Sequence, residues 1–238
     1  SNISNIALIF GVSLVGYSTA INPSSKRNFI ALGLSVLVAI YALSDLIISK
    51  LDSLMLLAVL AYFIYIMAIQ PNNNELTVEQ NDSSYLNLSI FLIIGLLSIT
   101  IGSNYAVING EKIAFLIGIP KLIIGLTVLA IGTSLPELAV TISALMKQKN
   151  QMVLGNIIGS NVLNIAVVMP ILGLFSAKSF DPSIITRDMS VMTILSLIFV
   201  IIALSFNYKN ISISVYRLMG MILVFSYIIY IGILGGLL

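Results

Sequence analysis

The sequence predicts an all-α polytopic membrane protein, and its composition and apolar periodicity support this fold class. Of the 238 residues, 59% are hydrophobic and 8% are charged, whereas a soluble domain carries about 25% charged residues. Apolar stretches of about 20 residues recur along the chain, a length that crosses a bilayer core of about 30 Å. The chain has no Cys and no His, which excludes disulfides and imidazole or thiolate metal ligands. Its net charge of +2 does not indicate a nucleic-acid partner.

About eight apolar segments are expected to form transmembrane helices. In chain order they cover residues 5–21, 29–48, 54–70, 87–108, 122–146, 152–175, 189–206 and 215–236. The polar stretch 71–86 separates the third segment from the fourth. It is too short for a folded domain, so we expect a flexible linker on the cytoplasmic side.

An internal repeat runs through the chain. The string SNISNIA at residues 1–7 matches SNVLNIA at residues 160–166 at five of seven positions. Two further matches follow in the same order, namely ALS at 42–44 with ALS at 203–205, and Tyr62 and Tyr65 with Tyr227 and Tyr230. The first three helices are therefore expected to repeat the last three.

This repeat predicts the domain organisation. Residues 1–70 are expected to be the remaining three helices of a first repeat, and residues 87–238 a complete second repeat of five helices. Two tandem units of five helices insert in opposite orientations, so the expected fold is a ten-helix inverted repeat (5+5) with its substrate site near the midplane. The same period predicts that about 70 to 75 residues of the first repeat precede residue 1.

One acidic residue lies deep in its apolar segment. Glu137 ends the string GTSLPE and lies ten residues before Lys147, which places it about 15 Å from that surface of the membrane. A carboxylate at this depth costs about 2.5 to 3.5 kcal/mol on insertion, so we expect it to bind a cation. Pro136 is expected to break the helix and to free backbone carbonyls around Ala130 to Thr133.

Oxygen atoms suited to a hard cation gather around this glutamate. Thr133 and Ser134 add hydroxyls, and hydroxyl, carbonyl and carboxylate oxygens together suit Na⁺ or Ca²⁺. In the next segment Asn156, Ser160 and Asn164 recur every four residues, so they share one helix face at a similar depth.

Several of these residues also have a purely structural interpretation. Thr133 and Ser134 could bond to their own helix, and Asn156 and Asn161 could be interhelical hydrogen-bonding residues. Gly155 and Gly159 are expected to let a neighbouring backbone approach closely.

Two motifs carry a resemblance to a known family. GLTVLAIGTSLPEL followed by LGNIIGSNVLN resembles the second α-repeat of the sodium/calcium exchanger branch of the cation/calcium antiporter superfamily. SNISNIALIFG resembles the tail of the first α-repeat, so the chain is similar to an N-terminally truncated member.

The resemblance implies a set of ion ligands. Glu137 would coordinate Ca²⁺, and the neighbouring oxygens would line the sodium and calcium sites. The implied set is Glu137, Thr133, Ser134, the carbonyl of Ala130, Ser160 and Asn164, with Ser1 and Asn5 at the equivalent positions of the first repeat. Asn rather than Asp at position 164 leans towards K⁺ independence. The helix at 87–108 would be one of two that slide to alternate access.

The expected function is secondary active exchange of Na⁺ for Ca²⁺ by alternating access, in a plasma or inner membrane, with no cofactor and no enzymatic activity. The first-repeat GTSxPE string is absent from this sequence, so one carboxylate supplies half the expected negative charge. A cation/H⁺ antiporter of the same fold and a truncated, non-transporting remnant remain alternatives. An intramembrane protease is disfavoured because the chain offers no Cys, no His and no deep pair of aspartates.

Overall fold

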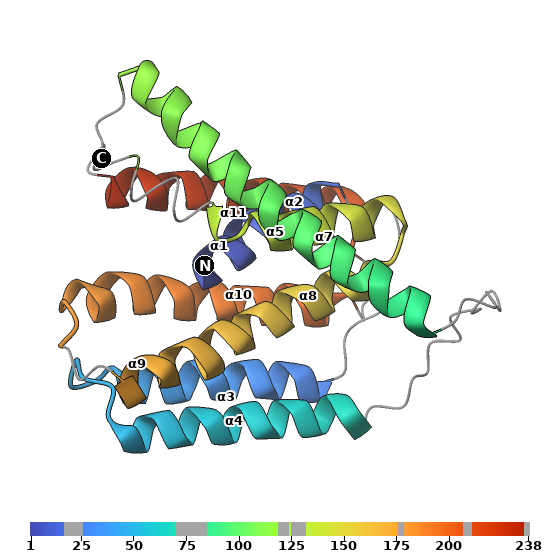
Figure 1. Cartoon of the computed structure of the whole chain (residues 1–238). Coiled ribbons are helices and arrows are strands. Elements are labelled where there is room, and N and C mark those ends of the chain that lie inside the picture. The colour runs from blue at the N-terminus through green and yellow to red at the C-terminus, as the bar shows by residue number, and fades with distance from the viewer. Residues whose placement is uncertain are drawn as a thin grey trace.

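The computed structural model describes residues 1–16, 26–69, 85–118, 124, 132–175, 179–206 and 211–235, and these are almost entirely helical (Figure 1). Five helical segments are long and apolar enough to span a membrane: Lys50–Ile69, Leu86–Leu116, Gln151–Phe175, Ile184–Ser205 and Ile213–Leu234. Three shorter apolar helices cover Asn2–Val15, Arg27–Ala42 and Leu135–Met146. Each predicted segment thus contains an apolar helix, which confirms the all-α polytopic class. The predicted linker lies almost wholly outside the described residues.

The elements follow one another along the chain in a simple order. Three short elements, α1 (Asn2–Ser4), the π-helical η1 (Asn5–Phe10) and α2 (Gly11–Val15), form one continuous helix. The next helices are α3 (Lys26–Ala42), α4 (Lys50–Ile69), α5 (Tyr85–Leu116) and α7 (Leu135–Met146). A second continuous helix joins α8 (Asn150–Leu163), the π-helical η2 (Asn164–Val168) and α9 (Met169–Phe175). The chain then forms η3 (Ile184–Met189), α10 (Ser190–Ser205) and α11 (Ile213–Leu234).

The helices of the two predicted repeats pack across each other. In the first part of the chain α4 packs against α9 of the second part, and in return α11 packs against α2 and η1. In the same way α3 contacts α8, and α10 contacts α1 and η1. Figure 1 shows α3 and α4 side by side along one edge of the bundle, with α5 crossing obliquely over α7. Each half of the chain therefore completes the packing of the other.

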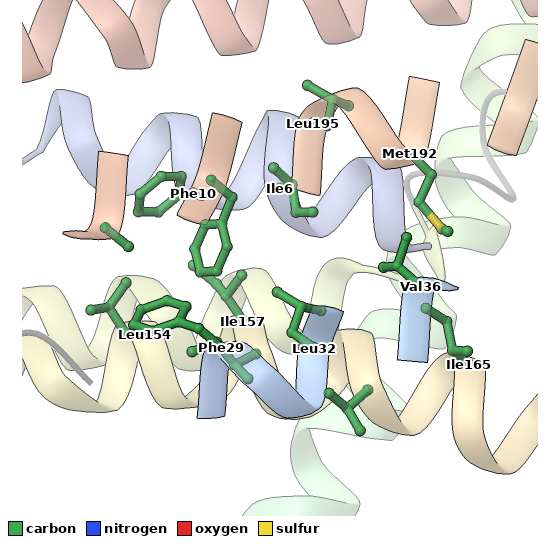
Figure 2. Packing of buried hydrophobic residues seen from close by; sticks show 14 of the residues in the cluster. Ile6, Phe10, Phe29, Leu32, Val36, Leu154, Ile157, Ile165, Met192 and Leu195 are labelled. Carbon is green, nitrogen blue, oxygen red and sulfur yellow. The ribbon is translucent and has the colours of Figure 1, made fainter. Parts of the chain in front are cut away.

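The hydrophobic core lies where η1, α3, α8 and α10 meet (Figure 2). Phe10 and Phe199 are fully buried and pack edge to face with ring centroids 4.7 Å apart. Phe29 of α3 extends the contact, with its ring 6.1 Å from that of Phe199. This aromatic cluster joins the first continuous helix to α3 and α10, and Leu154 and Ile157 of α8 belong to the same core. The two continuous helices carry most of the candidate site.

Glycine permits close helix contact at places that the sequence did not indicate. A Cβ added at Gly220 of α11 would lie 2.6 Å from the carbonyl oxygen of Gly11 in α2. A Cβ on Gly173 of α9 would collide with Ser53 and would lie 2.6 Å from Ile48 Cγ2. Around Gly155 and Gly159, by contrast, no atom of the described residues lies within 4 Å of an added Cβ. Among the described residues, therefore, no close approach of another backbone occurs at those two glycines.

Candidate cation-binding site

Glu137 lies in the first turn of α7. The helix begins at Leu135, and Ser134 before it has φ −107° and ψ 0°, outside the helical region. Pro136 therefore occupies the first turn, where its missing N–H removes no helical hydrogen bond. The break expected at the proline lies at Thr133–Ser134, directly before the helix whose first turn contains Pro136. The positive end of the α7 dipole then favours the negative charge on Glu137.

Asn156 of α8 ties the first turn of α7 in place. Its Nδ2 donates one hydrogen bond to the backbone oxygen of Glu137, at 3.1 Å, and another to Oγ1 of Thr141, at 3.0 Å. Thr141 follows Glu137 by one helical turn, so both acceptors lie on the α7 face that meets α8. Asn156 is thus an interhelical hydrogen-bonding residue, and its position also determines where Glu137 lies.

Ser160 links this group to the first residues of the chain. Its Oγ donates to the backbone oxygen of Asn156 at 2.7 Å and accepts from Nδ2 of Asn5 at 3.1 Å. The chain of contacts therefore runs from Glu137 through Asn156 and Ser160 to Asn5. Three separate elements, α7, α8 and η1, meet in it.

The contacts between the two repeated strings are reciprocal. Asn5 donates to Ser160, and Asn164 donates to Oγ of Ser1 at 3.1 Å. Ser1 matches Ser160 in the sequence, and Asn5 matches Asn164, so each serine is bonded by the asparagine of the other string. Contacts of this kind are typical of a two-fold relation between two segments.

Asn2 and its equivalent Asn161 meet where these strings cross. Nδ2 of Asn2 lies 3.5 Å from the backbone oxygen of Asn161, and Oδ1 of Asn2 accepts from Asn164 at 3.0 Å. Asn2 and Thr141 contribute to this network without having been predicted as site residues. The signal for Asn2 was the identity of the second position in both strings. For Thr141 it was the four-residue spacing from Glu137.

Both strings pass into a π-helix at their asparagine. The segment η1 starts at Asn5 and η2 starts at Asn164, which are equivalent positions of the repeat. Widened turns of this type are rare and frequently occur at functional sites, because they disturb the regular hydrogen-bond ladder and re-aim side chains. The local backbone is therefore specialised at the same point in both strings.

Buried side-chain oxygens without hydrogen-bond partners occur at Ser4, Asn5, Ser134, Glu137, Asn161 and Tyr227 of the described residues, and three of them belong to predicted site residues. They are Oδ1 of Asn5, Oγ of Ser134 and Oε2 of Glu137, and none bonds to another described residue. Leaving one buried polar group unpaired costs about 1 to 3 kcal/mol. Oxygens of carboxylate, amide and hydroxyl groups are the ligands of Na⁺ and Ca²⁺ in proteins. The donor set thus fits a hard cation, which would replace the missing partners.

The remaining site predictions are placed as follows. Thr133 is exposed beside Ser134 at the turn before α7, and Ala130 lies outside the described residues. Ser1, Asn5, Ser160 and Asn164 are brought together by the contacts above. In the part of the chain that the structure describes, no group of three or more Asp, Glu, His or Cys side chains could hold a metal. Within these described residues Glu137 is the carboxylate of the candidate site, and the oxygens of Asn5, Ser134, Ser160 and Asn164 are uncharged.

Comparison with known proteins identifies the family. The sequence model described as sodium/calcium exchanger protein matches residues 87–236, which is more than half of the chain. The chain belongs to the sodium/calcium exchanger family. The match includes the whole GTSLPE and GNIIGSN region, and with it Glu137, Asn156, Ser160 and Asn164, whereas Ser1, Asn2 and Asn5 lie outside it.

Relatives and a solved structure agree with this assignment. The inner membrane protein YrbG of Escherichia coli (strain K12) is 36% identical over 214 residues, which cover 85% of this chain and 66% of that protein. The putative antiporter CaxA of Alkalimonas amylolytica is 30% identical over 97% of this chain and 74% of its own length. The structure of the sodium/calcium exchanger from Methanococcus jannaschii matches with a TM-score of 0.73 and 29% identity over 97% of this chain and 72% of that one. The chain is an integral, multi-pass membrane protein of an exchanger family, and it spans about two thirds to three quarters of these relatives.

Proposed function

We propose that the complete protein exchanges Na⁺ for Ca²⁺ across its membrane. The observation that carries this proposal is the set of buried, unpaired oxygens on Asn5, Ser134 and Glu137. They come from η1, the turn before α7 and α7 itself, so a cation bound among them would join separate elements. The choice of ions is supported by the similarity to the M. jannaschii protein, which is named a sodium/calcium exchanger.

The charge of the site limits what the described residues bind alone. A single carboxylate neutralises one Na⁺, whereas Ca²⁺ needs six to eight oxygens and a second negative group for full compensation. The first-repeat glutamate predicted from the internal repeat would supply that group. Ser1, Ser160 and Asn164 would complete the oxygen shell at the junction of the two strings.

Alternating access would act through the turn before α7. Val107 of α5 lies directly against Gly132, where an added Cβ would collide with it. A displacement of α5 along its axis would therefore be transmitted to Thr133 and Ser134, beside the carboxylate. This proposed coupling gives the long helix a physical route to the site.

Transport by the full-length protein in proteoliposomes tests the function. We expect ⁴⁵Ca²⁺ uptake to follow an outward Na⁺ gradient, and Glu137→Gln to abolish it while the protein stays folded, because the amide removes the negative charge. Glu111→Gln is the matched control, since Glu111 is exposed on α5. Normal uptake by Glu137→Gln would refute the assigned site. Uptake that follows a pH gradient and ignores Na⁺ would show instead that the protein is a cation/H⁺ antiporter.

A further inference from the structure

A groove of about 550 Å³ lies between α10 and α11, apart from the proposed cation site. Its walls are apolar side chains of both helices, including Ile198 and Ile201 of α10 and Ile222 of α11. Ile3 and Ala7 of the first helix form its floor.

The groove exists because these two helices are splayed. The corresponding helices of the other half, α3 and α4, pack directly against each other. Among the described residues, α10 and α11 have no comparable contact, and each packs instead on the helix formed by α1, η1 and α2. The two halves therefore differ here, and the splayed pair leaves room for another molecule.

The groove is open on an apolar side in the part of the chain that the structure describes. Ile201 is 67% exposed and Ile222 is 59% exposed, and both lie in helices that are apolar and long enough to span the membrane. An apolar space of this size does not hold water, because water there would find too few polar partners. Its natural occupant is a hydrocarbon chain from the surrounding lipid.

One end of the groove is polar. Arg187 and Tyr230 line it, and both bind Asp188: Nε of Arg187 donates to Oδ1 at 2.6 Å and the Tyr230 hydroxyl donates to the same oxygen at 3.0 Å. Nη2 of Arg187 also donates to Oδ2 of Asp188, at 3.2 Å. Asp188 therefore accepts hydrogen bonds from two of the five N–H groups of the guanidinium. The remaining donors suit a phosphate oxygen, for which Arg has the right planar geometry.

The length of the groove fits an amphiphile. Arg187 lies three residues into the span that starts at Ile184, and Ile201 follows it by 14 residues, which corresponds to about 21 Å of helix. That distance runs from the membrane interface past the middle of a core of about 30 Å. The polar end is thus at headgroup level, and the apolar part is at acyl-chain depth.

We propose that this groove binds a phospholipid of the surrounding membrane, with one acyl chain between α10 and α11 and its phosphate on Arg187. The chain would pack against Ile3 and Ala7, which belong to the same continuous helix as Asn5. The lipid would thereby support the helix from the side opposite Ser160.

Native mass spectrometry of the full-length protein tests this, after delipidation and titration with phosphatidylglycerol. Ile198→Trp fills the groove and is expected to lower binding at least about tenfold. Leu197→Trp is the control, because the neighbouring residue is 60% exposed and does not line the groove. Equal lipid retention by the two variants would overturn the proposal, as would a wild type that binds no more lipid than Ile198→Trp.

A second pair of measurements tests the headgroup contact. Wild type is expected to prefer phosphatidylglycerol over diacylglycerol with the same chains, and Arg187→Gln to reduce that preference about tenfold. Arg217→Gln, at the exposed start of α11 and outside the groove, should keep the preference. If Arg187→Gln leaves the preference unchanged, phosphate does not bind at Arg187.

Discussion

Asn156 is expected to determine ion affinity without binding the ion. Its Nδ2 makes the two hydrogen bonds that hold the first turn of α7 against α8, to the Glu137 carbonyl and to Thr141. Asn156→Ala removes both of these interhelical bonds. Hydrogen bonds between membrane helices contribute about 0.6 kcal/mol each on average and up to about 1.7 kcal/mol, so the loss is about 1.2 kcal/mol, with an upper bound of about 3.4 kcal/mol.

This loss should be seen in the Ca²⁺ dependence of transport. If the bonds favour the ion-competent position of α7, about 1.2 kcal/mol corresponds to an increase of about sevenfold in the apparent KM for Ca²⁺. The assay is initial-rate ⁴⁵Ca²⁺ uptake by the full-length protein over a range of Ca²⁺ concentrations. Thermal unfolding of the same preparation in detergent measures any accompanying loss of stability.

A double-mutant cycle separates positioning from general destabilisation. Thr141→Val removes one of the two acceptors, so it is expected to raise KM by about threefold, for about 0.6 kcal/mol. The double variant should then show a coupling energy of about 0.6 kcal/mol with Asn156→Ala. A lower melting temperature with an unchanged KM would refute the positioning role and leave Asn156 as a packing residue only.

Two further predictions concern the junction of the two halves. In thermal unfolding, Gly220→Ala is expected to destabilise the protein by about 1 to 3 kcal/mol, because the added Cβ would lie 2.6 Å from the Gly11 carbonyl oxygen. The control is Gly95→Ala, which has no described atom within 4 Å of its Cβ and should be neutral or stabilising. Asn5→Ala removes both an unpaired oxygen and the donor to Ser160, and it should raise the KM for Ca²⁺ about tenfold. Asn109→Ala, which loses only a bond to its own helix, should not, and equal kinetics of these two asparagine variants would argue against Asn5 as a ligand.

The bilayer explains why much of the fold could be predicted. Each spanning segment must satisfy its backbone internally and present apolar side chains over about 20 residues, so the eight segments were visible in composition alone. The depth of Glu137 followed from counting residues back from Lys147. The ligand types followed from the absence of Cys and His, because only oxygen donors remain.

Local patterns were less reliable wherever the outcome depended on a neighbour. A proline beside a carboxylate predicted a break in the helix, and the backbone at Ser134 places that break directly before the first turn of α7. Small residues four apart at Gly155 and Gly159 suggested close packing, yet within the described part of the chain a close approach occurs at Gly11 and Gly220 instead. Glycine permits contact, but only the path of another helix produces it.

The sequence by itself determined the class of protein, the apolar segments, the repeated strings and the kinds of oxygen available for a cation. Only the tertiary structure decided which of those oxygens meet. Asn5 and Ser160 are separated by 155 residues, and Asn164 and Ser1 by 163, so no local pattern contains their pairing. It arises because the helices of each half pack on those of the other, which brings two equivalent strings face to face and leaves buried oxygens without donors beside Glu137.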